Sequence, residues 1–127
     1  MGQLSMWMWY GGRYTGYCLE FDRLSFPHAR EVIYTDDLEI DITDPSHRNA
    51  NWFFYKSTDW SNEEEVRSGA SQAIEPFNPR ALTRVILGKD IPKDREEQIR
   101  KWAVQRDPPV AVVNTVWDEF QSRLVVV

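Results

Sequence analysis

The N-terminal part of the chain combines one apolar run with one alternating segment. Residues 4–10 are almost all apolar and end at Gly11-Gly12, where backbone freedom interrupts regular structure. This run fits a helix and a strand equally well. In residues 16–22 the apolar side chains Tyr17, Leu19 and Phe21 recur at every second position. That alternation predicts a β-strand.

The next segments show a hairpin pattern followed by an aromatic run. Residues 31–35 and 38–42 flank the pair Asp36-Asp37, and apolar and polar residues alternate through the second segment. The pattern predicts a β-hairpin. Residues 52–55 are all aromatic, and the run is too short to show a period. We expect a short helix there.

Three further segments are predicted to be extended. Residues 63–68 and 73–77 are separated near Ser68-Gly69, where a glycine interrupts the pattern. Residues 82–87 are mostly apolar and end at Gly88, as expected for a buried strand.

The C-terminal third contains the clearest helix signal. Pro92 suits the first turn, acidic residues follow it, and Asp107-Pro108-Pro109 ends the helix. Its apolar face is predicted to contain Ile99, Trp102 and Ala103. The tail is rich in β-branched residues in 110–116 and 123–127, on either side of Asp118-Glu119, and it is predicted to form a closing hairpin.

Together these elements predict an α+β fold. Strands outnumber helices and short turns join most of them, which favours a mostly antiparallel sheet with a few helices on one side. The chain has 127 residues, of which 42% are hydrophobic and 13% aromatic, so it can bury a core. We expect one domain spanning residues 1–127.

Charge and cysteine content narrow the environment. The formal net charge is -5, which disfavours non-specific binding to nucleic acid and to anionic lipid. Cys18 is the only cysteine, so no intrachain disulfide can form, and the two histidines leave no soft-ligand cluster for a metal. We expect no metal or cofactor. No segment has the pattern of a signal peptide or a membrane span, which indicates a cytoplasmic protein.

Several separated motifs resemble one bacterial family. They are MWMWYGGRYTGYCLEF followed by VIY, then KSTDWSNEEEVR, and finally PFNPRALTRVILG. In order and spacing, from about Met6 to Gly88, they resemble the family catalogued as domain of unknown function 2971. The resemblance implies the C-terminal half of such a protein, with a truncated N-terminus. Where the family motif usually carries histidine, this chain has Trp9 and Tyr14.

The triple-glutamate stretch contains the main candidate site. In a strand, Glu63, Glu65 and Arg67 would project to one face. Two carboxylates and a guanidinium could bind a ligand, or one carboxylate could have its pKa raised by the other and act in catalysis. Pairing with Arg67 would instead lower the pKa of Glu65. The competing interpretation is a solvated strand face with a surface ion pair.

A Glu-x-Glu pair on a strand is also similar to the carboxylate motif of some ADP-ribosyltransferases. The resemblance implies that Glu65 is the catalytic carboxylate, with Glu63 as its helper and Arg67 binding an anion. That superfamily needs further motifs before and after this pair, and no convincing first motif is found in this sequence.

Aromatic residues near the N-terminus form a second candidate, a pocket that stacks a planar ligand or a cation. The residues that would line it are Trp7, Trp9, Tyr10, Tyr14 and Tyr17. Core packing is the alternative and stronger interpretation. Cys18 is expected to be a small buried hydrophobe, and His28 and His47 are in predicted loops with no evident partner.

Two functions follow from these observations. The first is a non-catalytic ligand-binding or protein-interaction domain that self-associates as a dimer and could take a small-molecule or nucleotide ligand. A truncated sheet with apolar, β-rich ends tends to expose an edge that a second copy can cover. The second is an enzyme that acts on a nucleotide or nucleic acid through Glu65.

Overall fold

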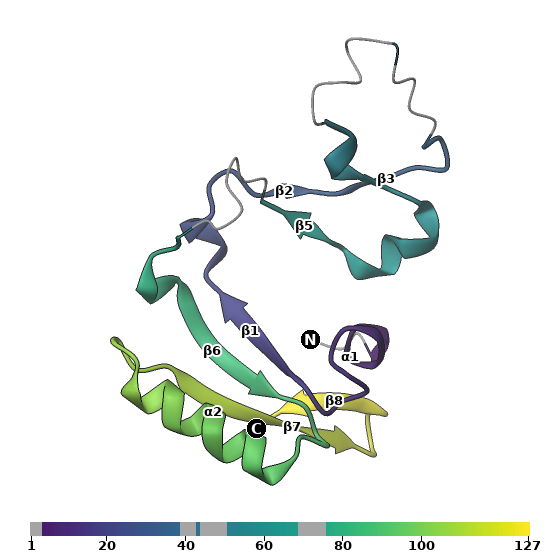
Figure 1. The fold of residues 1–127 in the computed structure, drawn as a ribbon. Coiled ribbons are helices and arrows are strands. Elements are labelled where there is room, and N and C mark those ends of the chain that lie inside the picture. The colour runs from purple at the N-terminus through teal and green to yellow at the C-terminus, as the bar shows by residue number, and fades with distance from the viewer. Residues whose placement is uncertain (1–3, 39–42, 44–50, 69–75) are drawn as a thin grey trace. The chain divides into compact units, whose positions relative to one another are not determined.

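The chain divides into two compact units in a computed structural model, which describes residues 4–38, 43, 51–68 and 76–127. Unit 1 consists of residues 1–25 and 76–127, and unit 2 consists of residues 26–75. The chain therefore passes from unit 1 into unit 2 and back again (Figure 1). The expectation of a single domain stays a prediction.

Unit 1 contains a four-stranded sheet in the order β1-β6-β7-β8. Its strands are β1 (Tyr17–Phe21), β6 (Leu82–Leu87), β7 (Ala111–Asp118) and β8 (Arg123–Val126). Its helices are α1 (Leu4–Trp9), α2 (Lys93–Gln105) and the short 3-10 helices η1 (Arg23–Ser25) and η5 (Pro79–Ala81). The strand expected in residues 16–22, the strand 82–87, the helix after Pro92 and the closing hairpin are confirmed. The apolar run of residues 4–10 forms a helix over Leu4–Trp9.

The α+β class is confirmed, but the sheet is mixed. β1 pairs with β6 and β7 with β8 in antiparallel fashion, whereas β6 and β7 are parallel. Parallel neighbours need a crossover, and α2 provides it between the two strands. The order of a strand, a helix and a second strand along the chain is the sequence signal for this β-α-β unit.

The core of unit 1 has one cluster on each face of the sheet. On one face Val85 and Leu87 of β6 pack with Ile99 of α2. On the other, Ile86 packs with Trp7 of α1 and Leu124 of β8. Consecutive residues of a strand point to opposite faces, so α1 and α2 cover opposite sides of the sheet. The expectation of helices on one side was wrong in this respect.

The predicted apolar face of α2 is only partly correct. Ile99 and Ala103 are buried, whereas Trp102 is 57% exposed. Residues 99 and 103 are four apart and lie on the same side of the helix, while residue 102 is rotated away from that line by its position in the turn. The large aromatic side chain was therefore a poor guide to the buried face.

Unit 2 is built from short elements. β2 (Arg30–Glu31) pairs with β5 (Val66–Arg67) in antiparallel fashion, and β3 (Ile33–Tyr34) pairs with β4 (Tyr55–Lys56) in parallel. The 3-10 helices η3 (Asn51–Phe54) and η4 (Thr58–Glu63) lie on either side of β4 in the sequence. Among the residues whose burial is described in this unit, only Val32 is buried.

The expectations for unit 2 have mixed outcomes. The short helix predicted at residues 52–55 is confirmed as η3, which ends at Phe54. Residues 39–42, the second strand of the predicted hairpin, and residues 73–75 lie outside the described residues. The extended segment 63–68 was wrong at its start, because Glu63 belongs to η4 and only Val66–Arg67 form a strand.

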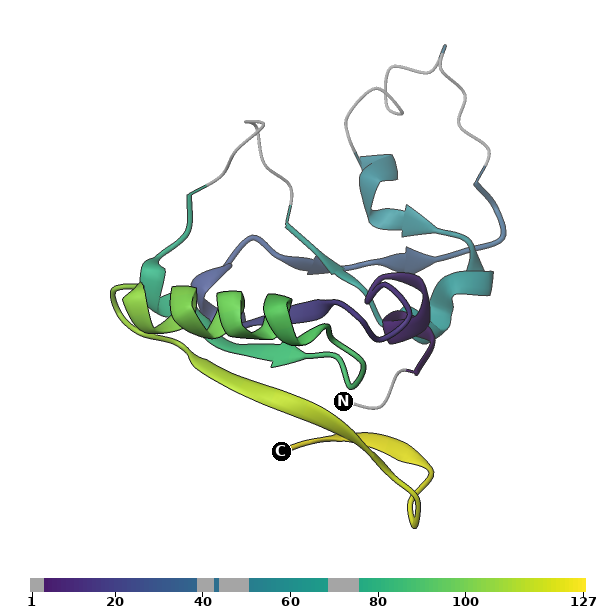
Figure 2. The same cartoon turned by 60° about the horizontal axis from the view of Figure 1, so that its bottom comes forward.

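The β7–β8 hairpin extends beyond the rest of the sheet (Figure 2). The first half of β7, residues 111–114, pairs with β6, and the second half, residues 115–118, pairs with β8. β6 ends opposite Asn114, so it does not reach the second half of β7. Apart from Asn114, which also exchanges backbone hydrogen bonds with Val127, the two halves of β7 thus pair with different strands.

Candidate functional site

A left-handed residue brings the candidate carboxylates together. η4 begins after Ser57, whose side chain accepts a hydrogen bond from the backbone N–H of Asp59, and it is followed by Glu64, which has φ 47°. The backbone turns at Glu64 before β5 begins. Glu63 and Glu65 therefore stand on either side of a turn rather than on one strand face, and both side chains still reach Lys56.

Lys56 of β4 bridges the two carboxylates. Its Nζ donates to Oε2 of Glu63 at 2.5 Å and to Oε2 of Glu65 at 3.2 Å. The side chain of Glu63 is 5% exposed, so its charge is largely withdrawn from water and needs such a partner. Nζ of Lys56 also lies 5.0 Å from the ring centre of Trp60, a cation-π distance.

Arg67 holds Glu65 from the other side. Nε of Arg67 donates to Oε1 of Glu65 at 2.5 Å and Nη2 donates to Oε2 at 3.1 Å, which is a bidentate pair. Nη1 donates to the backbone carbonyl of Phe53 at 2.5 Å, and the guanidinium carbon lies 5.2 Å from the Phe53 ring centre. All three guanidinium nitrogens of Arg67 are therefore engaged.

We call Lys56, Glu63, Glu65 and Arg67 the charged cluster. It contains two cations and two anions, so its formal charges cancel. The backbone N–H of Glu65 also donates to the hydroxyl of Tyr34 at 2.8 Å, which ties the cluster to β3. Three of these residues were predicted from the sequence. Lys56 was not, because nothing in the local spacing relates β4 to the turn after η4.

The ionisation of the cluster follows from its contacts. Hydrogen bonds from Arg67 hold the pKa of Glu65 below its usual range, against an opposing effect of burial. The hydrogen bond to Glu63 raises the pKa of Lys56 above its usual range. Glu65 and Lys56 are thus held more firmly in their charged forms. An ionised carboxylate accepts hydrogen bonds and has no proton to donate, so this arrangement is the opposite of the one that makes a general acid.

The candidate aromatic residues separate into buried and exposed groups. Trp7 is in the core, and Tyr14 packs against that cluster as a partly buried side chain. Trp9, Tyr10 and Tyr17 are exposed. Of the five, Trp7 therefore packs in the core, whereas Trp9, Tyr10 and Tyr17 are largely exposed to solvent.

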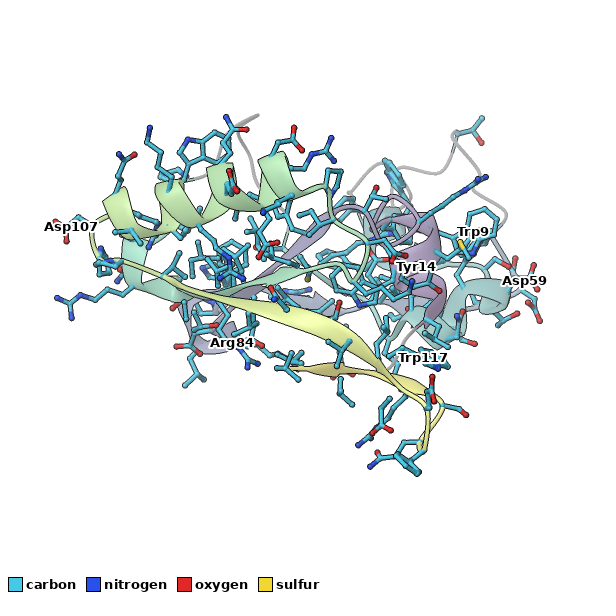
Figure 3. The ribbon with its side chains drawn as sticks, turned by 90° about the horizontal axis from the view of Figure 1, so that it is seen from below. Trp9, Tyr14, Asp59, Arg84, Asp107 and Trp117 are labelled. Carbon is cyan, nitrogen blue, oxygen red and sulfur yellow. The ribbon has the colours of Figure 1, made fainter. Side chains whose placement is uncertain are left out.

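Tyr14 lies on an unusual turn that the sequence did not predict. Gly12, Arg13 and Tyr14 all have positive φ, and this turn is held by a hydrogen bond from the backbone N–H of Asp90 to the carbonyl of Tyr14. Lys89 places its Nζ 5.1 Å from the centre of the Tyr14 ring (Figure 3 labels Tyr14). Gly88 is required beside this turn, because a Cβ there would come within 2.7 Å of the Tyr14 carbonyl carbon.

The remaining candidates are the single cysteine and the two histidines. Cys18 is partly buried, and desolvation together with the charge of Glu20 raises the pKa of its thiol, which favours the unreactive protonated form. His28 is exposed, and His47 lies outside the described residues. In the part of the chain that the structure describes, no three His, Cys, Asp or Glu side chains are grouped as a metal site would require. Across the same residues, no helix has the length and apolar character to cross a membrane.

Comparisons with known proteins place the chain next to none of them. No family model matches it, no curated protein matches it, and no solved structure matches it. The resemblance to domain of unknown function 2971 therefore stays a prediction.

Proposed function

We propose that this protein is a non-catalytic interaction domain that self-associates. The observation that carries the proposal is the apolar surface of the protruding β7–β8 hairpin. Val116 is 41% exposed, Val127 is 64% exposed and Phe120 at the turn is fully exposed. Trp117 is 43% exposed on the same hairpin (Figure 3).

The position of these side chains supports a binding role. β7 and β8 alternate their side chains between the two faces of the sheet, so the exposed group covers both faces of the hairpin. Apolar side chains gathered on one projecting element mark interaction sites more often than singly scattered ones do. Covering them with a second copy of the chain would remove this surface from water, which is the main driving force for association.

The charged cluster supports the non-catalytic part of the proposal. Each carboxylate is held by a cation, and Arg67 has no guanidinium nitrogen left without a protein acceptor. A site that binds an anion or moves a proton needs a group that is available to the substrate. The cluster is better suited to joining β4, β5, η3 and η4 than to chemistry.

Multi-angle light scattering over a range of concentrations tests the proposal. We expect a dimer for the native chain and a shift toward monomer for Val116→Lys, which puts a charge on the hairpin. Val104→Lys is the matched control, because Val104 is also an exposed valine (75%) but lies on α2. A native chain that stays monomeric at several hundred micromolar would refute self-association.

The alternative function is an enzyme that acts on a nucleotide or nucleic acid through Glu65, with Glu63 and Arg67 assisting. Titration calorimetry with NAD and common nucleotides tests it. Binding that is retained by Glu65→Gln while turnover is lost would support the enzyme, and the absence of any binding would exclude it. The exposed aromatic residues Trp9, Tyr10 and Tyr17 offer stacking surfaces for such a ligand.

A further inference from the structure

The negative charge of this protein is concentrated in unit 2. Residues 26–75 contain eleven aspartates and glutamates but only four lysines and arginines, an excess of seven negative charges. The rest of the chain has two more basic than acidic residues, so the formal charge of -5 is very unevenly distributed. A surface with charge of one sign favours partners of the opposite sign.

Three of the four basic residues of unit 2 already have partners within it. Lys56 and Arg67 are ion-paired inside the charged cluster, whose formal charges cancel. Arg30 lies 5.7 Å from the ring centre of Phe54. Arg48, the fourth, lies outside the described residues. The excess negative charge is therefore carried by carboxylates outside the charged cluster.

Three exposed aspartates lie where two strands of unit 2 end. β3 and β4 are parallel, so their carboxyl ends are at the same edge, where Asp36 and Asp37 follow β3 and Asp59 follows β4. The hydroxyl of Thr58 donates a hydrogen bond to the carboxylate of Asp36, which joins the two segments. Within the described residues none of the three carboxylates has a cationic partner. We call Asp36, Asp37 and Asp59 the acidic end.

The same pair of strands has an apolar face that is open to solvent. Ile33 and Tyr55 are opposite each other in the register, so their side chains point to the same side, and they are 51% and 42% exposed. Tyr34 and Lys56 point to the other side, where Lys56 belongs to the charged cluster and the Tyr34 hydroxyl accepts a hydrogen bond from the N–H of Glu65. Only one face of this strand pair is therefore used within unit 2.

We propose that this open face of β3 and β4, together with the acidic end, binds a basic segment of another protein. The segment would place an apolar side chain against Ile33 and Tyr55 and a lysine or arginine beside the acidic end. Charge selects this occupant, because the negative excess of unit 2 repels nucleic acid, anionic lipid and unit 2 of a second copy. The partner is additional to the self-association proposed above, which uses the β7–β8 hairpin of unit 1.

Both features of the surface are needed for a specific complex. Ion pairs at an exposed surface each contribute little and are screened by salt, so three carboxylates alone would give a weak attraction. Covering Ile33 and Tyr55 removes apolar area from water, and tyrosine is among the side chains that contribute most at interfaces. The segment that fits therefore carries basic and apolar side chains next to each other.

Fluorescence anisotropy with two labelled peptides and the full chain tests the proposal. The first peptide repeats lysine, leucine and glycine, and the second has glycine in place of every leucine. We expect the first peptide to bind saturably and at least about tenfold more tightly than the second, because only the first can cover the apolar face. Its affinity should fall several-fold when the ionic strength rises from about 0.05 M to about 0.3 M.

A charge variant tests the location of binding. The combined substitutions are Asp36→Asn, Asp37→Asn and Asp59→Asn, which keep the side-chain shape and an oxygen acceptor at each position. We expect this variant to bind the first peptide about tenfold more weakly while its circular dichroism spectrum stays unchanged.

Two further variants complete the test. The matched control for charge removes three exposed carboxylates of unit 1 and combines Asp94→Asn, Glu97→Gln and Glu119→Gln. We expect it to bind the first peptide as the native chain does. Ile33→Thr keeps a β-branched residue in the strand but shortens the apolar face, and it should weaken the first peptide about threefold and leave the second unchanged.

The outcomes decide between this surface and its alternatives. A loss of affinity in the acidic-end variant and none in the control variant supports the proposal. Equal losses in both variants would show that the peptide responds to overall charge, and equal affinities for both peptides would show that the apolar face plays no part; either result overturns it, as does the absence of saturable binding.

Light scattering separates this proposal from self-association. If the native chain is a dimer and the acidic-end variant is a monomer, a second copy occupies this face and the basic partner is overturned. If the peptides fail to bind while the native dimer persists in the acidic-end variant, only the present proposal fails. A monomeric native chain that binds the first peptide at the acidic end supports the present proposal and refutes self-association alone.

Discussion

Glu65 shows how a single residue can be misjudged from its neighbours in the sequence. Three consecutive glutamates suggest mutual repulsion, which would raise a carboxylate pKa. In the fold, the residues that decide its ionisation are Arg67 and Lys56, and both lower the pKa of Glu65. The sequence also allowed the alternative that Glu65 pairs with Arg67, and the structure contains this ion pair.

The sign of this shift predicts how acid affects stability. A carboxyl group whose pKa is lower in the folded state stabilises the fold above its unfolded value of about 4.3, and that contribution is lost as the pH falls through the folded value. We expect native protein to lose more stability than Glu65→Gln between about pH 5 and about pH 3, although Glu65→Gln is less stable at neutral pH. Urea unfolding at several pH values measures both. Glu119→Gln, on the exposed turn before β8, controls for the loss of one negative charge, and equal acid sensitivity of native protein and Glu65→Gln would contradict the argument.

At the scale of elements, α2 shows what helical periodicity can and cannot predict. The start of α2 at Pro92, its acidic first turn and its end before Pro108 could be predicted from the sequence, because each depends on local backbone chemistry. The face of α2 that packs against the sheet was harder to predict. Ile99 meets Val85 and Leu87 of β6, whereas Trp102 faces away from them.

This difference predicts unequal costs of truncation in α2. Ile99→Ala should reduce the free energy of unfolding by about 2–4 kcal/mol, because it leaves a cavity beside two buried residues. Trp102→Ala removes a larger side chain but should cost less than about 1 kcal/mol, because that side chain is already exposed. Chemical denaturation of the two variants, analysed with one shared m-value, compares their free energies of unfolding. A larger loss for Trp102→Ala would mean that this tryptophan packs against something in solution.

Local patterns predicted most of unit 1 and little of the candidate site. Strands such as Leu82–Leu87 and the β7–β8 hairpin were found because alternation and β-branched residues act over a few positions. The parallel pairing of β6 with β7 was not predicted, although the succession of strand, helix and strand from β6 through α2 to β7 indicates it. Glu63, Glu65 and Arg67 were correctly grouped, but through an incorrect strand. The hydrogen bond between Lys56 and Glu63 depends on the positive φ of Glu64, which could not be predicted from the sequence.

The whole molecule has an uneven distribution of buried residues. Unit 1 has two clusters of buried apolar side chains, one on each face of its sheet, with Ile86 and Leu87 fully buried. Among the residues of unit 2 whose burial is described, only Val32 is buried, and the strands that the structure describes there are two residues long. Ion pairs such as those of the charged cluster add little free energy compared with a packed core.

We therefore expect local opening to cost less free energy in unit 2 than in unit 1. Amide hydrogen exchange followed by mass spectrometry should show β6 and β7 protected at least about 100-fold more strongly than β2 and β5. Peptides from α2 serve as an internal control, because that helix packs against β6 and should share its protection. Equal protection of β5 and β6 would show that the units unfold together.

The interruption of unit 1 by unit 2 also affects how the chain is made. β1 leaves the ribosome before its partner β6, which follows only after residues 26–75 have been synthesised. During that interval β1 has no strand with which to pair, and its residues, Tyr17–Phe21, remain unpaired in the nascent chain. Because the entropic cost of closing a loop grows only slowly with its length, the delay is a matter of time more than of free energy. The sheet can therefore be completed only after β7 and β8 have also emerged from the ribosome.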